Sequence, residues 1–140
     1  MEEIAKMLLE GNHSLVVANS GGITAFDGRG VSDLFRLLHD EPKMLRGASV
    51  ADKVVGKAAA SLMVMASVGS VYAYVLSQPA FDLLQKSGIR VEYHNIVPYI
   101  INCTGTGMCP LEERCQRCAT SEESLEQIRL FISEMKNKKR

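Results

Sequence analysis

The segment from residue 49 to residue 67, SVADKVVGKAAASLMVMAS, constrains the fold more than any other part of the chain. Read as a helix, the segment is apolar on every side after its first turns, and a helix without a polar face is typical of a buried position. Ser49 and Asp52 are spaced as in a capping box, with aspartate in place of the usual glutamate. The segment therefore predicts a buried central helix that begins near Ser49.

The rest of the chain predicts a single α/β domain over residues 1–140. Hydrophobic periodicity indicates helices at 2–10, 31–38, 78–88 and about 120–136, and strands at 15–18, 23–26, 70–77 and 89–100. A strand, a helix and a strand in succession from 70 to 100 are typical of a parallel crossover unit. The tyrosines follow the strand patterns, and we interpret them as packing residues: Tyr72, Tyr74, Tyr93 and Tyr99.

Charge and hydropathy exclude several classes of partner. Sixteen basic and sixteen acidic residues give a formal net charge of zero, so no general positive field draws the chain to nucleic acid or to an anionic membrane. No window reaches the roughly 20 apolar residues that a membrane-spanning helix needs. The first residues carry acids where a secretory signal carries bases. We therefore expect a cytoplasmic protein that binds neither nucleic acid nor membranes.

Three charged residues, Asp52, Lys53 and Lys57, lie in the first turns of the predicted central helix. Lys53 and Lys57 would share a helical face and repel each other by about 0.2–0.5 kcal/mol. Gly56 between them costs about 1 kcal/mol relative to alanine within a helix. A site for a phosphate or a carboxylate explains this cluster, with Asp52 as an orienting group or a general base. Alternatively, the aspartate is a cap and the lysines extend to solvent.

Two motifs, DKVVGKAAA (52–60) and VPYIINCTGTGMCPLE (97–112), resemble the uncharacterised prokaryotic family called domain of unknown function 1893, as does the order of elements. The resemblance covers roughly residues 14–113. It implies a cytidine-deaminase-like fold, a three-layer α/β/α arrangement with a mixed sheet of about five strands. It also implies that the amino end of the central helix faces a cleft. Asp52, Lys53, Lys57 and Cys109 would then form a site for a small molecule such as a nucleotide or another phosphorylated metabolite.

The same resemblance extends the candidate site to other parts of the chain. It implies that a neighbouring hairpin lines the cleft with Asn19, Ser20, Gly21 and Gly22. Glu112, at the end of the second motif, is a further candidate ligand-binding residue. Related folds often dimerise, so we expect a homo-oligomer.

The deaminase comparison also makes a prediction about zinc. A zinc deaminase needs a His or Cys ligand two residues before a catalytic glutamate, and a Pro-Cys-x-x-Cys motif that opens the following helix. The matching stretches are Val50-Ala51-Asp52 and residues 79–83, and the ligand positions are all apolar: Val50, Ala80 and Leu83. We therefore expect no zinc at the deaminase position.

All four cysteines lie between residues 103 and 118. The pair Cys115-x-x-Cys118 has the spacing of half a zinc or iron–sulfur site, whereas the five-residue gaps from Cys103 to Cys109 and from Cys109 to Cys115 are less typical. A metal or cluster site that uses all four cysteines, or a redox-sensing module, is one interpretation. A second is a reactive Cys109 that caps a short helix starting at Pro110, where the helix dipole lowers the thiol pKa. A third gives none of them a chemical role.

Overall fold

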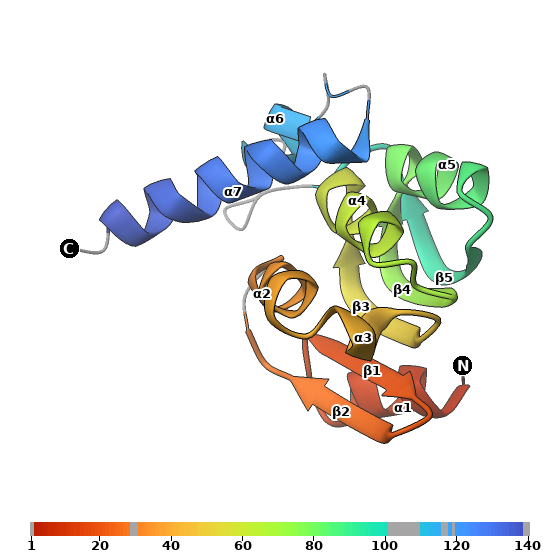
Figure 1. The fold of residues 1–140 in the computed structure, drawn as a ribbon. Helices are drawn as coiled ribbons and strands as arrows, with labels where there is room; N and C mark the ends of the chain where they lie inside the picture. Colours follow the sequence, from red (N-terminus) through yellow and green to blue (C-terminus); the bar gives the residue numbers. More distant parts are fainter. Residues whose placement is uncertain (1, 29–30, 101–109, 116–117, 119, 139–140) are drawn as a thin grey trace.

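A computed structural model describes residues 2–28, 31–100, 110–115, 118 and 120–138 (Figure 1). Its strands are β1 (Leu15–Asn19), β2 (Gly22–Phe26), β3 (Ser49–Val55), β4 (Ser70–Ser77) and β5 (Arg90–Val97). Its helices are α1 (Glu2–Glu10), α2 (Ser32–Asp40), α3 (Pro42–Leu45), α4 (Lys57–Met65), α5 (Gln78–Lys86), α6 (Pro110–Cys115) and α7 (Ser121–Lys138).

The strands form one mixed sheet in the order β2-β1-β3-β4-β5. β1 is antiparallel to both β2 and β3. β3, β4 and β5 run parallel to one another, and the helices α4 and α5 make the two crossovers between them. The carboxyl ends of three neighbouring strands therefore meet at one edge of the sheet, next to the amino ends of α4 and α5.

Helices cover both faces of the sheet and bury a core on each (Figure 1). On one face α1 packs on β1 and β3, with Ile4 and Leu8 against Val16 and Ala51. The opposite face carries α4 and α5, and α2 and α7 pack in turn against α4. The large core on that side includes Leu62 and the other buried residues of α4. The expected α/β arrangement, a mixed sheet of about five strands with helices on both faces, is thus confirmed.

The predicted central helix at 49–67 is wrong in its first half, because residues 49–55 form strand β3 and the helix begins only at Lys57. Valine-rich sequence favours strands, and a strand buried on both faces reads as a continuous apolar run, which periodicity does not distinguish from a buried helix. Ser49 is accordingly no helix cap, since its hydroxyl bonds to that of Ser70 at 2.8 Å. The hydrophobic periodicity of the sequence predicted four strands and did not identify β3.

The other predicted elements agree closely with the structure. Helix α5 opens with Pro79 in its first turn and with the Ser77 side chain as its cap, which accepts a hydrogen bond from the Ala80 amide at 3.2 Å. Gly88 follows the helix with a φ of +78°, a conformation that favours glycine. The predicted short helix that starts at Pro110 is present as α6.

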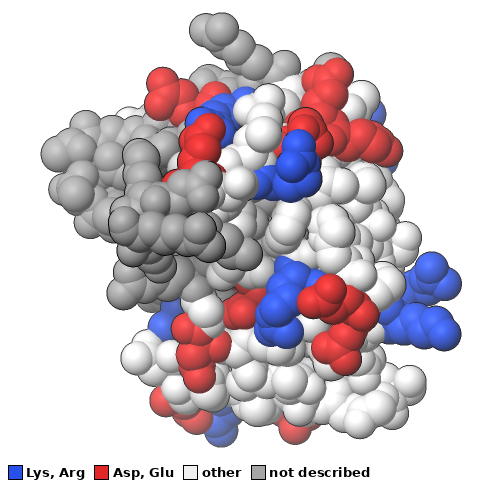
Figure 2. Space-filling model, turned by 60° about the vertical axis from the view of Figure 1, so that its left-hand side comes forward, with Lys and Arg blue, Asp and Glu red and all other residues white. Residues whose placement is uncertain are grey.

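The surface carries no dominant charge of one sign on the face that Figure 2 presents, where the described Lys and Arg side chains lie beside Asp and Glu side chains. This distribution agrees with the balanced net charge of the sequence. Within the described parts of the chain, every helix is too short or too polar to cross a lipid bilayer.

Candidate functional site

The amino end of α4 is closed by a carboxylate from a distant part of the chain. The helix has no side-chain cap of its own, because its N-cap residue is Gly56. The Glu112 carboxylate of α6 takes that role: Oε1 accepts a hydrogen bond from the Lys57 amide at 2.5 Å, and Oε2 accepts one from the Ala58 amide at 3.0 Å. One carboxylate therefore satisfies two of the amides that every helix leaves without an internal partner.

Gly56 is required at the start of α4 because of this close approach. A Cβ atom at this position would lie 1.6 Å from Oε1 of Glu112 and 2.2 Å from the carboxyl carbon. The backbone of Gly56 is extended, with a φ of −101°, so space and not backbone strain selects glycine here. Gly56 therefore lies just before α4 and does not carry the stability cost of a glycine within a helix.

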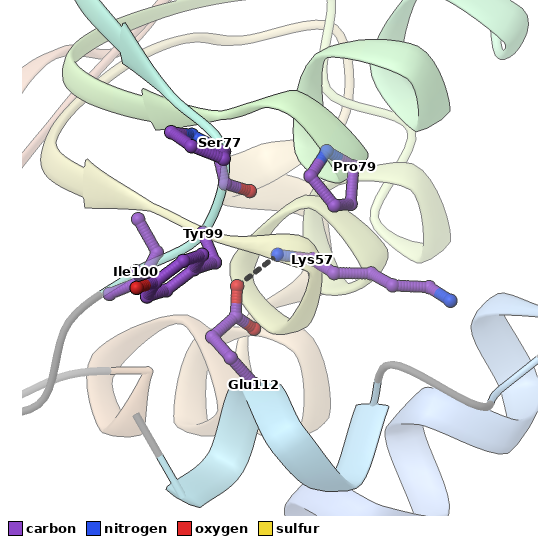
Figure 3. Close-up of a pocket in the computed structure, with 7 residues that line it drawn as sticks. Lys57, Ser77, Pro79, Tyr99, Ile100 and Glu112 are labelled. Carbon is purple, nitrogen blue, oxygen red and sulfur yellow. Dashed lines mark hydrogen bonds between the residues drawn. The ribbon is translucent and has the colours of Figure 1, made fainter. Parts of the chain in front are cut away.

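The two lysines expected to converge on an anion lie on different elements and point to different partners. Lys53 lies on β3, and its Nζ donates to Oδ1 of Asn12 at 2.6 Å. Lys57 is the first residue of α4, and its Nζ donates to the carbonyl oxygen of Cys118 at 2.6 Å. Figure 3 shows the Lys57 side chain extending away from Tyr99 and Ile100. The prediction of a shared helical face is therefore wrong.

A pocket of about 160 Å³ lies beside the Glu112 cap, and we call it the α4 pocket. Its lining residues come from the ends of β4 and β5 and the starts of α4, α5 and α6 (Figure 3): Lys57, Ser77, Pro79, Pro98, Tyr99, Ile100 and Glu112. In open α/β sheets, ligands bind at the carboxyl ends of parallel strands, and the α4 pocket has that position. Its volume is close to that of a cavity that holds a single benzene ring.

Sequence reasoning identified two of these lining residues, Lys57 and Glu112, and missed the others. Pro98, Tyr99 and Ile100 belong to the motif at residues 97–112, which is the sequence signal that could have identified them. Tyr99 follows the end of β5 and has 45% of its surface exposed, so it is not the packing residue that the strand pattern predicted.

Burial dominates the electrostatics of Glu112. The residue is 9% exposed, and desolvation of its carboxyl raises the pKa, although the Ala58 and Lys57 amides and the Lys57 charge act in the opposite direction. A buried carboxyl of raised pKa can accept a hydrogen bond when ionised and donate one when protonated.

Asp52 occupies a different buried position, in the middle of β3 between Leu15 of β1 and Ala73 of β4. Burial raises its pKa to about 7, with a smaller contribution from the charge of Asp33, whereas the amides of Val54 and Lys53 lower it. The side chain does not line the α4 pocket. Because Val50-Ala51-Asp52 lies on a strand, it is not the helix-borne motif of a zinc deaminase, while Ala80 and Leu83 do lie at the start of α5.

The hairpin candidates also lie apart from the α4 pocket. Asn19 ends β1, and its side chain accepts from the Gly21 amide at 2.8 Å and donates to the Met44 carbonyl at 3.0 Å. These contacts shape the turn at Ser20 and Gly21 and attach it to α3. Residues 19–22 do not line the pocket, so the structure does not bring them to Lys57 and Glu112.

Of the cysteines, Cys103 and Cys109 lie outside the described residues. Cys115 is fully buried at the end of α6, and burial raises its pKa to about 12, with further increases from Cys118 and Glu112. The Cys118 amide donates to the Cys115 carbonyl at 3.0 Å. Among the described residues, no group of three or more His, Cys, Asp or Glu side chains is placed to hold a metal ion.

Comparisons with known proteins agree on one family. The family model described as "TM1506: Domain of unknown function (DUF1893)" matches residues 3–132. The crystal structure of a DUF1893 family protein, TM1506 from Thermotoga maritima, is similar to this chain with a TM-score of 0.81 and 28% sequence identity. That match covers 95% of this chain and 88% of the other. Among curated proteins, none matches.

The contact between Glu112 and Gly56 leads to a prediction about stability. Replacing Glu112 by alanine leaves two helix amides without their partner and should lower the free energy of unfolding by about 1–3 kcal/mol. Gly56→Ala should cost more than this, because its new Cβ collides with the carboxylate. In the Glu112→Ala background, however, Gly56→Ala should cost much less, so the two effects should not add.

Urea unfolding of the two single variants and the double variant measures this coupling. Glu113→Ala is the matched control, since Glu113 is the exposed neighbour of Glu112 on the same helix, and it should change stability by less than about 0.5 kcal/mol. Additive costs in the double variant would contradict a direct contact between Gly56 and Glu112.

A second prediction concerns the pH dependence of stability. The pKa of Asp52 in the folded state, about 7, lies above its ordinary value of 3.8, so the folded chain retains a proton that the unfolded chain releases. The stability linked to this proton is present below about pH 4 and is lost as the pH rises through 7. Asp52→Asn cannot ionise, and we therefore expect its stability relative to the wild type to increase by about 3 kcal/mol from pH 5 to pH 8.

Urea unfolding of both proteins at several pH values tests this expectation. Glu112 titrates in the same direction, but it is present in both proteins and cancels in the difference. Asp82→Asn, at an exposed position of α5, should follow the wild-type pH profile. If Asp52→Asn also follows it, Asp52 does not carry the retained proton.

Proposed function

This chain belongs to the DUF1893 family, and from that premise we propose that it binds a small molecule with a planar ring, such as the base of a nucleotide, in the α4 pocket. The observation that carries the proposal is the position of the pocket at the carboxyl ends of β4 and β5, beside an exposed tyrosine. The mixed five-stranded sheet with helices on both faces supports the further proposal of a deaminase-like fold. A fold alone does not assign a reaction.

The lining of the pocket favours a flat, largely apolar group. Tyr99 presents an aromatic ring, and Pro79, Pro98 and Ile100 present apolar surfaces. Small-molecule sites typically combine such walls with a few polar groups that fix the orientation of the ligand. Because aromatic rings pair with one another by stacking or by edge contacts, Tyr99 is the residue that we expect to contact the ring.

Glu112 would provide the polar contact to the ring, and it would also disfavour a phosphate at the amino end of α4. Its carboxylate already occupies the amino end of α4, where a phosphate would otherwise bind. A phosphate in the same place would face a carboxylate across a short distance, and like charges repel strongly in a buried site. The ring of a nucleotide, with N–H donors directed to Glu112, therefore suits the pocket better than its phosphate or a phosphorylated metabolite without a ring.

Ligand binding can be measured by the thermal stability of the protein in the presence of nucleobases, nucleosides, nucleotides and sugar phosphates. A ligand at 100 times its Kd stabilises the folded state by about 2.7 kcal/mol, and we expect such an effect from at least one ring compound and from no sugar phosphate. Tyr99→Ala should weaken the affinity about tenfold, because it removes the aromatic contact.

The matched control is Tyr74→Ala, which removes a tyrosine of similar exposure that does not line the pocket. Its affinity should equal that of the wild type. Binding that survives Tyr99→Ala unchanged, or stabilisation by sugar phosphates alone, would contradict the proposed site.

The cysteine segment 103–118 supports a second proposal, a site for zinc or an iron–sulfur cluster, or a redox-sensing module. Its described cysteines are Cys115 and Cys118, and the Cys118 amide donates a hydrogen bond to the Cys115 carbonyl. A buried thiol with a pKa of about 12 is a poor nucleophile as a free group, but a bound metal ion deprotonates its thiol ligands.

Metal and sulfide analysis of protein purified without oxygen distinguishes these roles. A metal site predicts about one zinc ion, or iron with sulfide, per chain and a loss of that metal in Cys118→Ser. Four titratable thiols in the unfolded protein, with no bound metal before unfolding, would contradict it.

A further inference from the structure

The edge strand β5 differs from its neighbours in its exposure to solvent. Among the described residues, β5 pairs with a strand on one side only, at the end of the sheet. The residues from Glu92 to Asn95 are all exposed, in contrast to the buried residues along β3 and β4. The side chain with the largest apolar surface among them, Tyr93, is 44% exposed. Such an edge can pair with another chain, and proteins usually protect it with short length, proline or a bulge.

β5 is eight residues long and contains no proline, so its edge protection is limited to the charged side chains of Arg90 and Glu92. Arg90, Glu92 and His94 share one face of the strand, because they are spaced two residues apart. Tyr93 lies between Glu92 and His94 on the other face. When two copies run antiparallel about Tyr93, the Glu92 carboxylate of each copy lies opposite the His94 ring of the other and can accept a hydrogen bond from it.

We propose that two copies of this chain associate through antiparallel pairing of their β5 strands, centred on Tyr93. In that register Glu92 of each copy lies opposite His94 of the other, and a ladder of seven residues, 90–96, forms across the two-fold axis. The two five-stranded sheets become one continuous sheet.

The charges select this register over its neighbours. Pairing centred on Glu92 would place two carboxylates directly opposite each other, which is destabilising. Pairing centred on His94 would place the two histidines opposite each other and Glu92 opposite an apolar residue, Ile96. Pairing centred on Val91 would place Arg90 opposite Glu92, but only residues 90–92 of β5 would then lie in the ladder. The register centred on Tyr93 pairs each glutamate with a histidine and keeps seven residues paired.

Aromatic contacts hold the edge in place before it pairs. The ring of His94 stacks on Tyr74 of β4 with centroids 4.8 Å apart and planes 9° from parallel. The ring of Tyr93 meets Phe81 of α5 edge-on at 5.8 Å. Side chains that are already fixed lose less entropy when a complex forms.

The opposite edge of the sheet is a weaker candidate. β2 has five residues, begins with a glycine and carries no charged side chain. It would provide a shorter ladder and no charge pair. Ile23 of β2 is 40% exposed, close to the exposure of Tyr93, which makes it a matched control position for the same substitution.

Sedimentation equilibrium from about 1 to 100 µM protein tests the proposal. The wild type should have twice the 15.4 kDa mass of one chain. Tyr93→Lys places two like charges beside the two-fold axis and should weaken the dimer at least tenfold, whereas Ile23→Lys should leave it intact. A monomeric wild type, a dimer unaffected by Tyr93→Lys, or dissociation by Ile23→Lys would each overturn the proposal.

A second pair of variants keeps the test decisive if Tyr93→Lys does not fold. Tyr93→Cys places two thiols opposite each other across the axis, so glutathione disulfide should oxidise them to one interchain disulfide, in excess over any formed by the wild-type cysteines. Asn95→Cys, on the same face, would lie opposite Val91 and should not give that excess. Equal or greater cross-linking of Asn95→Cys would overturn the register.

Discussion

The buried helix α4 depends on one carboxylate that the helix does not itself supply. Glu112 accepts hydrogen bonds from the amides of Lys57 and Ala58, and the absence of a side chain at Gly56 makes room for it. This contact joins the crossover between β3 and β4 to the C-terminal part of the fold. It also forms one wall of the α4 pocket, so the same interaction that completes the helix defines the candidate site.

Local sequence signals predicted several elements whose ends are marked by proline, glycine or a capping residue, but they did not predict α3, which begins at Pro42. Helix α5 is an example of a predicted element, since Ser77, Pro79 and Gly88 mark its two ends. The segment 49–55 carried a misleading mark, the cap-like spacing of Ser49 and Asp52, and its valines fit a buried strand as well as a buried helix. Gly56 was the available boundary, but a glycine within an apolar run has several explanations, and only the three-dimensional contact with Glu112 distinguishes them.

The sequence predicted only two residues of the candidate site, Lys57 and Glu112, and each lies within one of the two family-like motifs. Lys57 and Glu112 lie 55 positions apart in the sequence, and no local pattern states that they meet. Asp52 and Lys53 were grouped with Lys57 on the assumption of a continuous helix. Once β3 separates them, Asp52 becomes a buried carboxyl of the sheet and Lys53 a partner of Asn12. The error in one secondary-structure boundary thus moved two residues out of the site.

The reach of the Glu112 contact also bears on how the chain acquires its structure during synthesis. Residues 57 and 58 leave the ribosome more than fifty residues before residue 112, so the first turn of α4 is made well before its cap exists. Until then the buried helix has two amides without their native partner. Contacts between residues far apart in sequence are slow to form. The start of α4 therefore gains its native cap only after α6 has been synthesised and has docked, when all five strands of the sheet have already left the ribosome.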